Sequence, residues 1–232
     1  MVNMLKKHCF NLYNFIKKIF LILYAKLKIK ITPSSITLDA YLLLNGVNTF
    51  SEGYTKQIVG QVSLIKDIIN KNQITKVMEI GFHAGHSAEL MLEFKEISLV
   101  SFDIDQYPYT KIGYKYIKSK YHSRHIMIRG DSTISIPNYI AENPGITFDL
   151  IFIDGGHEYE IVKTDIINCK KLAGRNTIVI VDDTVFSKVY DYSAGPTKVW
   201  EESIESKQII EIGRKEFDDG RGMAWGKYNF FN

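Results

Sequence analysis

Carboxylates and one imidazole stand where two apolar runs of the sequence end. The run FDLIFID ends in Asp154, and His157 follows three residues later, after two glycines. The run TIVIVDD ends in Asp182 and Asp183. An imidazole, with an ordinary pKa near 6.5, can accept a proton from a hydroxyl group around neutral pH. Clustered carboxylates repel one another unless a hard divalent cation binds their oxygens, so the three aspartates predict a metal site.

Both interpretations have structural alternatives. His157 could cap a helix that begins near Glu158, and Glu158 itself suits a helix N-terminus because of the helix dipole. One aspartate of the pair Asp182 and Asp183 could cap a turn while the other faces water. The residues alone leave these alternatives open.

A glycine-containing turn follows an earlier apolar run, in the stretch MEIGFHAGHS. Gly81 and Gly85 allow the backbone to approach a ligand where the next helix begins, with Glu79 before the turn and Ser87 after it. The spacing G-x-x-x-G differs from the G-x-G-x-x-G of nicotinamide-dependent dehydrogenases, which disfavours that class. An ordinary turn between a strand and a helix is the alternative.

Two further runs end in polar residues that suit a nucleoside. Asp103 lies 22 residues after Gly81, where a carboxylate can accept both ribose hydroxyls. Asp131 and Ser132 follow the next run, where an adenine ring could be read, although Gly-Asp-Ser is also common in turns. The glycine turn and Asp103 together favour a cofactor that contains a nucleoside.

Five short apolar runs must position these residues. Helix-like or looping segments separate them, which predicts a parallel sheet with both faces covered. A helical stretch that starts at Ser51 precedes them, and QIIEIGRKEF and MAWGKYNFF predict a C-terminal antiparallel hairpin. The five runs are residues 76–81, 98–105, 125–131, 148–154 and 177–183.

The first thirty residues contain seven lysines and no acidic residue. Their apolar residues recur every three or four positions, which predicts an amphipathic helix, followed by a linker that ends near residue 35. Such a helix could lie on an anionic membrane, form a homodimer interface or pack on its own domain. The rest of the chain is mildly acidic, which argues against a nucleic-acid partner.

The whole chain has 232 residues, 45% of them hydrophobic, which predicts one domain with an appendage. Its two cysteines form no disulfide framework, and no apolar run approaches the roughly 20 residues of a membrane span. We therefore expect a soluble cytoplasmic protein.

The motifs MEIGFHAGHS, SFDID, FIDGGHEYE and VDDTVF, in this order, resemble those of the class I S-adenosylmethionine-dependent methyltransferases. Within that class the chain is most similar to the O-methyltransferases of the catechol and caffeoyl-CoA type and to methyltransferase family 24. The resemblance implies a Rossmann-like α/β fold with a seven-stranded, mostly parallel sheet. The last strand would be antiparallel, helices would cover both faces, and extra helices would precede a methyltransferase domain at residues 36–232.

The resemblance also implies roles for individual residues. The metal ligands would be Asp154, Asp182 and Asp183, with Mg²⁺ expected and Ca²⁺ or Mn²⁺ as alternatives. His157 stands where the catechol-type enzymes have a lysine base, and Asp183 stands where the family usually has asparagine, which adds a negative charge. The residues that would bind S-adenosylmethionine are Glu79, Gly81, Phe82, His83, Gly85, Ser87, Asp103, Ile104, Asp131, Ser132 and Asp154.

The expected function is therefore metal-assisted methyl transfer to a hydroxyl of a small molecule, either a sugar or a catechol-like compound. Phe186, Tyr190 and Tyr192 could wall the acceptor pocket, and the helix from Ser51 would cover the cofactor. One alternative is a metal-independent methyltransferase. Another is a catalytically silent adaptor, tethered through the basic N-terminal helix.

Overall fold

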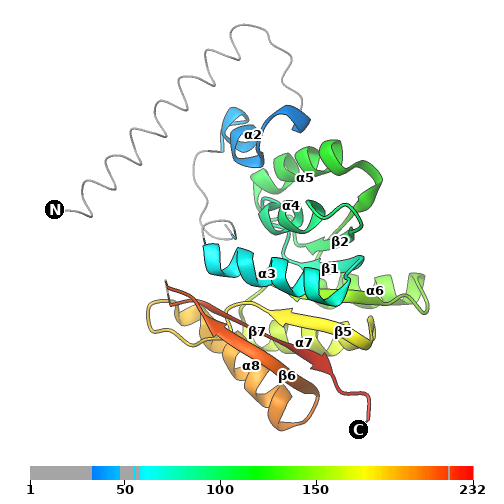
Figure 1. Cartoon of the computed structure of the whole chain (residues 1–232), viewed down its shortest axis with the longest axis vertical. Coiled ribbons are helices and arrows are strands. Elements are labelled where there is room, and N and C mark those ends of the chain that lie inside the picture. The colour runs from blue at the N-terminus through cyan, green and yellow to red at the C-terminus, as the bar shows by residue number, and fades with distance from the viewer. Residues whose placement is uncertain (1–32, 48–54, 56–57, 219, 232) are drawn as a thin grey trace, which may run out of the picture. The chain divides into compact units, whose positions relative to one another are not determined.

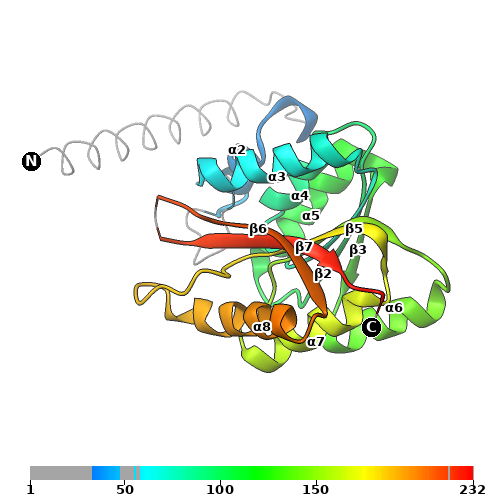
Figure 2. The same cartoon turned by 60° about the horizontal axis from the view of Figure 1, so that its bottom comes forward.

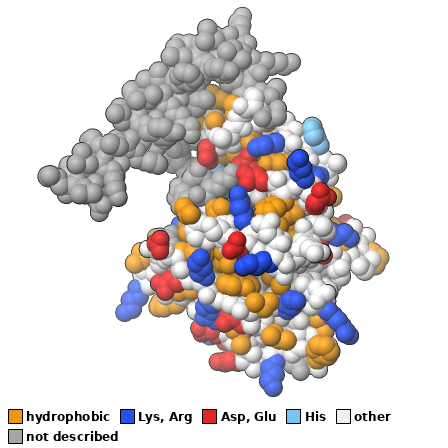
Figure 3. Space-filling model, viewed as in Figure 1, with side chains coloured by type: hydrophobic (Ala, Val, Ile, Leu, Met, Phe, Trp, Pro, Cys, Tyr) orange, Lys and Arg blue, Asp and Glu red, His pale blue; other side chains and the backbone are white. Residues whose placement is uncertain are grey.

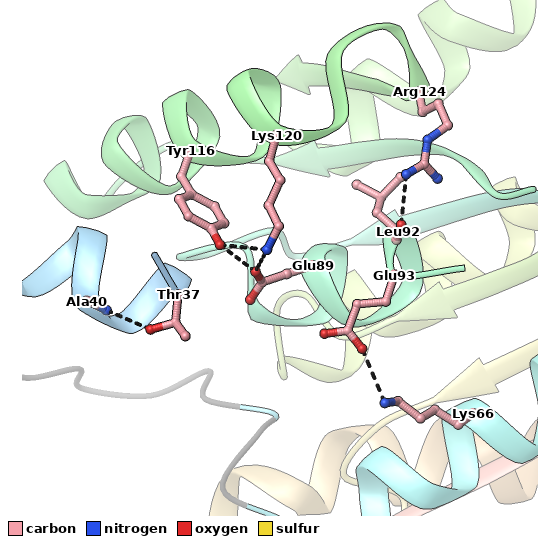
Figure 4. A network of polar contacts seen from close by, with 9 residues as sticks. All are labelled: Thr37, Ala40, Lys66, Glu89, Leu92, Glu93, Tyr116, Lys120 and Arg124. Atoms are coloured by element: carbon pink, nitrogen blue, oxygen red, sulfur yellow. Dashed lines mark hydrogen bonds and ion pairs between the residues drawn. The ribbon is translucent and has the colours of Figure 1, made fainter. Parts of the chain in front are cut away.

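The computed structural model describes residues 33–47, 55, 58–218 and 220–231. The chain forms two compact units, Met1–Glu52 and Gly53–Asn232. In the first unit a 3-10 turn, η1 (Pro33–Ser35), precedes helix α2 (Leu38–Leu44), whose N-cap Thr37 accepts a hydrogen bond from the Ala40 amide at 3.2 Å (Figure 4). The predicted amphipathic helix lies outside the described residues. The sequence predicted a domain boundary at residue 35, whereas the two units divide after Glu52. The domain boundary at residue 35 stays a prediction.

The second unit is built on a seven-stranded sheet in the order β3-β2-β1-β4-β5-β7-β6 (Figure 1). Strands β1 to β5 are parallel, and β7 runs antiparallel to both of its neighbours. This topology confirms the predicted Rossmann-like fold and its antiparallel last strand. The strands are β1 (Lys76–Ile80), β2 (Ser98–Asp103), β3 (His125–Arg129), β4 (Phe148–Ile153), β5 (Ala173–Val181), β6 (Ile209–Glu216) and β7 (Gly222–Tyr228).

Helices cover both faces of this sheet. Figures 1 and 2 show α3, α4 and α5 along one face and α6, α7 and α8 along the other. No helix among the described residues is long and apolar enough to cross a bilayer. The helices are α3 (Val59–Asn72), α4 (His86–Leu92), α5 (Pro108–Tyr121), α6 (Ser132–Glu142), α7 (Tyr159–Lys170) and α8 (Ala194–Glu205), with 3-10 turns η3 (His122–Arg124) and η4 (Asp191–Ser193).

The strands form where the sequence is apolar because both faces of the sheet are buried. In β4, Leu150 to Ile153 are all buried, as a continuous apolar run predicts. Strand β5 begins at Ala173, four residues before the predicted start at Thr177. The added residues include the exposed Arg175 and Asn176, and they join β4 across a bulge, so they carry no apolar signal.

The strand register brings three chemically important positions to one edge of the sheet. Ile80 pairs with Ile153, and Ile153 pairs with Val181. The Asp154 amide donates to the Ile80 carbonyl at 2.9 Å, and the Asp182 amide donates to the Ile153 carbonyl at 3.0 Å. The glycine turn, Asp154 and Asp182 therefore all follow level strand ends, where ligands bind in open α/β sheets.

A buried polar network holds α4, the helix that follows the glycine turn, against α5. Figure 4 shows Tyr116 and Lys120 pointing at Glu89, whose carboxylate lies 2.7 Å from both the Tyr116 hydroxyl and the Lys120 ammonium. Arg124 donates to the Leu92 carbonyl at 2.9 Å and so satisfies the end of α4. These contacts fix the helix that the glycine turn begins.

Charged side chains of both signs are interspersed on the face shown in Figure 3. One exposed pair, Lys66 and Glu93, lies 3.2 Å apart and links α3 to the end of α4. Exposed pairs of this kind contribute little to stability, because water screens them.

Candidate active site

An acidic group with one histidine occupies the carboxyl edge of β4 and β5. Asp154, His157 and Asp183 each offer a ligand atom, and these atoms lie within 4.8 Å of one another. His157 Nε2 is 3.0 Å from Asp183 Oδ2. Asp183 has a left-handed backbone (φ 55°) and is buried, and its Oδ1 has no hydrogen-bond partner among the described residues.

Asp182 has different partners from Asp183. Its Oδ2 accepts a hydrogen bond from Gln61 Nε2 of α3 at 2.6 Å, and its Oδ1 accepts from the Asp183 amide at 2.9 Å. The structure therefore places the three predicted metal ligands at one edge, but it groups His157, and not Asp182, with Asp154 and Asp183. Gln61 could not be predicted as a site residue, because nothing in its local sequence indicates a contact with a residue 121 positions away.

Burial and mutual repulsion disfavour negative charge in this group. Burial, followed by the charge of Asp183, raises the pKa of Asp182 to about 8. Burial, followed by the charges of Asp182 and Asp183, raises the pKa of Asp154 well above its ordinary value. The positive charge of Arg221 opposes both changes. A bound positive charge would therefore stabilise the ionised carboxylates of this site.

Aromatic side chains lie beside His157. The Tyr192 ring is 4.8 Å from the His157 ring, and the Tyr190 ring is 5.7 Å from Tyr192. Phe186 is 53% exposed on the same segment. The guanidinium carbon of Arg221, at the tip of the β6–β7 hairpin, lies 5.7 Å from the centroid of the Tyr190 ring. Arg221 could not be predicted as a site residue, because it lies in a turn. These residues could contact an acceptor molecule.

The glycine turn is packed directly against the acidic group. Gly81 has φ 94°, and a Cβ atom there would lie 1.8 Å from the Asp154 carbonyl oxygen. Gly85 has φ 90° and precedes α4 as its N-cap. Both glycines are thus required by the backbone, and Gly81 packs the turn closely against Asp154.

Glu79 lies fully buried beneath this turn. Its carboxylate accepts hydrogen bonds from the Ser87 hydroxyl at 2.8 Å and from the Ser101 hydroxyl at 2.5 Å. Burial raises its pKa to about 7, although the two hydroxyls oppose the change. Ser87, expected to bond a ligand, donates to Glu79 here, and Ser101 was missed because its polar side chain stands inside an apolar run.

Asp103 faces the glycine turn from the end of β2. Its Oδ2 accepts from the His83 amide at 2.7 Å, and its Oδ1 accepts from the Asp105 amide at 2.6 Å. The His83 ring lies 2.7 Å from the Tyr109 hydroxyl. Ile104 is 59% exposed beside Asp103. The predicted ribose-binding acid and the glycine turn are therefore in direct contact.

Asp131 caps helix α6, which Ser132 begins. Its Oδ1 accepts from the Thr133 hydroxyl at 2.7 Å and from the Thr133 amide at 2.8 Å, and these bonds lower its pKa. Asp165 of α7 lies fully buried close by, at a position that the sequence pattern did not single out. The turn-forming interpretation of Asp131 is therefore compatible with the structure, and its adenine-side role stays a prediction.

The family model described as a methyltransferase domain matches residues 78–184, from β1 to the residue after Asp183. This segment contains the glycine turn, Asp103 and the acidic group. No curated protein sequence matches the chain.

Solved structures share the fold at low sequence identity. An O-methyltransferase from Bacillus cereus in complex with S-adenosylhomocysteine is 16% identical, with a TM-score of 0.66 over 83% of this chain and 90% of that one. A Staphylococcus aureus protein assigned as a caffeoyl-CoA O-methyltransferase is 17% identical, with a TM-score of 0.62 over 93% and 100% of the two chains. A TDP-rhamnose 3'-O-methyltransferase of calicheamicin biosynthesis is 17% identical, with a TM-score of 0.58 over 81% and 91%.

Proposed function

We propose that this chain, a class I S-adenosylmethionine-dependent methyltransferase, methylates a hydroxyl oxygen of a small molecule. The pairing of His157 with Asp183, 3.0 Å apart, carries the proposal. These are the two positions at which the chain departs from the catechol-type pattern of lysine and asparagine. The extra carboxylate, Asp183, therefore lies next to His157, which replaces the lysine base. The negative charge that the first change adds lies beside the imidazole that the second change introduces.

The pair suits proton acceptance. If Asp183 accepts the Nε2 proton of His157, the imidazole keeps its lone pair on Nδ1, the atom that would take the acceptor's hydroxyl proton. A carboxylate in this place also stabilises the imidazolium that forms. Gly195 holds the pair in place, because α8 packs so closely that a Cβ atom there would lie 2.1 Å from the His157 carbonyl oxygen.

The loop between β1 and α4 is the expected cofactor site. When bound, S-adenosylmethionine supplies an electrophilic methyl group on a sulfonium sulfur. Gly81 and Gly85 leave room for a close backbone approach, and Asp103 offers carboxylate oxygens at the end of β2. The structural relatives that hold S-adenosylhomocysteine or S-adenosylmethionine support this choice of cofactor.

The acidic group fits a divalent cation, with Mg²⁺ expected and Mn²⁺ or Ca²⁺ as alternatives. The buried, unpartnered Oδ1 of Asp183 and the short separation of its neighbours support this assignment. Asp154 and Asp183 would hold the cation, and Asp182 would stand beside them. When bound, the cation would lower the pKa of the acceptor hydroxyl.

The acceptor is proposed to be a sugar or a catechol-like compound. One structural relative is described as a TDP-rhamnose methyltransferase and another as a caffeoyl-CoA methyltransferase, so related folds serve both kinds of acceptor. Tyr190, Tyr192 and Phe186 support an acceptor with a flat or apolar face, because aromatic side chains stack on such surfaces.

Calorimetric titration of S-adenosylmethionine tests the proposal, first with Mg²⁺ and then with a chelator. We expect binding that Asp103→Ala abolishes and that an Asp182→Ala, Asp183→Ala double variant retains. If binding and methyl transfer are both unaffected by the chelator, the metal-independent alternative is favoured. The absence of binding under every condition would contradict the proposal and favour a silent adaptor.

Residues 1–30 are proposed to contact an anionic membrane or to form a homodimer interface. Both are predictions from the lysine content and apolar spacing of that segment, as is a cytoplasmic location. Flotation with anionic vesicles and the mass in solution, measured before and after deletion of residues 1–30, separate the two interfaces.

A further inference from the structure

A buried chain of polar side chains crosses the sheet from β3 to β1. His125 Nε2 lies 2.8 Å from the Ser101 hydroxyl oxygen, and that hydroxyl donates to Glu79 at 2.5 Å. Ser87 donates to the other oxygen of Glu79 at 2.8 Å. Glu79, Ser101 and His125 are each 0% exposed. Three neighbouring parallel strands thus contribute one polar residue each.

The hydrogen bonds between these side chains have a defined donor-to-acceptor direction. Ser101 has one hydroxyl proton, which it donates to Glu79, so its contact with His125 requires the proton on Nε2. The Nδ1 atom of His125 then carries a lone pair, and it is buried without a hydrogen-bond partner among the described residues. Burial, with the charge of Lys118, lowers the pKa of His125 to about 4, so the imidazole is neutral.

His125 also contacts the cofactor loop through Phe82. The two rings stack with their centroids 5.4 Å apart, and Phe82 is itself buried. His125 therefore contacts Phe82 directly and is linked to Glu79 through the Ser101 hydroxyl. Buried polar groups destabilise a core unless they are paired, and apolar residues would fill these positions without that penalty. A role in the cofactor site explains why polar residues stand here.

We propose that His125 and Ser101 are positioning residues that fix the orientation of the Glu79 carboxylate beneath the proposed cofactor loop, where a bound cation keeps it ionised. This inference rests on the proposed function, because it assigns the charge to the cationic sulfonium end of S-adenosylmethionine. The neutral imidazole orients the Ser101 hydroxyl, and the hydroxyl orients the carboxylate. A fixed charge favours S-adenosylmethionine over S-adenosylhomocysteine, which lacks the sulfonium charge.

The test is the ratio of the affinities for these two ligands, measured by calorimetry. The variants are Glu79→Gln, Ser101→Ala and His125→Phe, the last of which keeps a ring against Phe82. His125→Gln restores an N–H donor near Nε2. Ser98→Ala, at the exposed start of the same strand β2, is the matched control.

We expect Glu79→Gln to lower the affinity for S-adenosylmethionine about tenfold or more, as loss of a charged partner does. Ser101→Ala and His125→Phe should lower it less, and all three should lower the affinity for S-adenosylhomocysteine by much smaller factors. His125→Gln and Ser98→Ala should keep the wild-type ratio.

A purely structural role predicts a different pattern. It would weaken both ligands equally and lower the melting temperature, with the affinity ratio unchanged, and that result would overturn the inference. If Ser101→Ala does not fold, the comparison of His125→Phe with His125→Gln still decides. A wild-type protein that binds neither ligand would contradict the proposed function itself, so the two failures are distinguishable.

Discussion

Asp165 of α7 should make the stability of the protein depend on pH. It is 0% exposed, and neither of its carboxylate oxygens has a hydrogen-bond partner within 3.5 Å among the described residues. Burial raises its pKa to about 7, the nearby Ser132 hydroxyl opposes this rise, and the charge of Asp131 reinforces it. The folded protein therefore prefers the protonated acid, whereas the unfolded chain ionises near pH 4.

The sign and size of the effect follow from these pKa values. A group whose folded pKa is raised stabilises the protein below its unfolded pKa and loses that contribution as the pH rises through the folded value. Between pH 5 and about 7, unfolding releases close to one proton from Asp165. Over two pH units this proton corresponds to about 3 kcal/mol, at 1.36 kcal/mol per unit.

Asp165→Asn removes the ionisation, so the variant should gain stability over the wild type by about 3 kcal/mol on going from pH 5 to pH 8. For a domain of this size that corresponds to about 6–12 °C in melting temperature. Denaturant unfolding at both pH values measures the difference, and any cost of the amide itself cancels because it is independent of pH. An equal difference at both pH values would refute the reasoning.

Asp149→Asn is the control. Burial tends to raise the pKa of Asp149, but hydrogen bonds from the Lys76 and Thr75 amides and from the Thr75 hydroxyl outweigh burial and lower it. A group with a lowered folded pKa stabilises the protein above its unfolded pKa and loses that contribution only as the pH falls through the folded value. Asp149→Asn should therefore be destabilising by the same amount at pH 5 and pH 8.

Three further changes test the site. His157→Asn should lower the rate of methyl transfer by about 10²–10⁴-fold, and His157→Lys should recover part of it, in single-turnover measurements, because an amine can also act as base. Asp183→Asn removes the carboxylate 3.0 Å from His157. It should therefore displace the acidic limb of the profile of methyl-transfer rate against pH. Gly81→Ala should lower the stability by about 4 kcal/mol or more in denaturant unfolding, since its Cβ would lie 1.8 Å from the Asp154 carbonyl oxygen.

Most of the fold could be predicted from the sequence, because buried parallel strands are continuous apolar runs. The five predicted runs all contain strands, and the hairpin after residue 208 is β6 and β7. The start of β5 could not be predicted, because its first residues lie at the exposed end of the strand beyond a bulge. There the backbone pairs without an apolar pattern.

The contacts between site residues were harder to predict than their identity. Asp154 and Asp182 could be expected at one edge because parallel strands end there together. The side chains of Asp182 and Asp183 have different partners. This difference depends on the left-handed backbone of Asp183 and on Gln61 of α3, which donates a hydrogen bond to Asp182. The link between Ser101 and His125 depends on side chains that project from adjacent strands, and no spacing within either strand encodes it.

The position of β7 has a consequence for synthesis of the protein. β7 is synthesised after the other six strands of the sheet, yet it lies between β5 and β6, and its Ala224–Gly226 segment pairs with Val181–Val179. Until it emerges, β5 presents one unpaired edge of apolar sequence, the kind of edge that invites pairing between nascent chains. A chain that stops before β6 and β7 also lacks Arg221, whose positive charge acts on Asp154 and Asp182 in the folded protein. Early translation stops would therefore yield an aggregation-prone chain without a complete site.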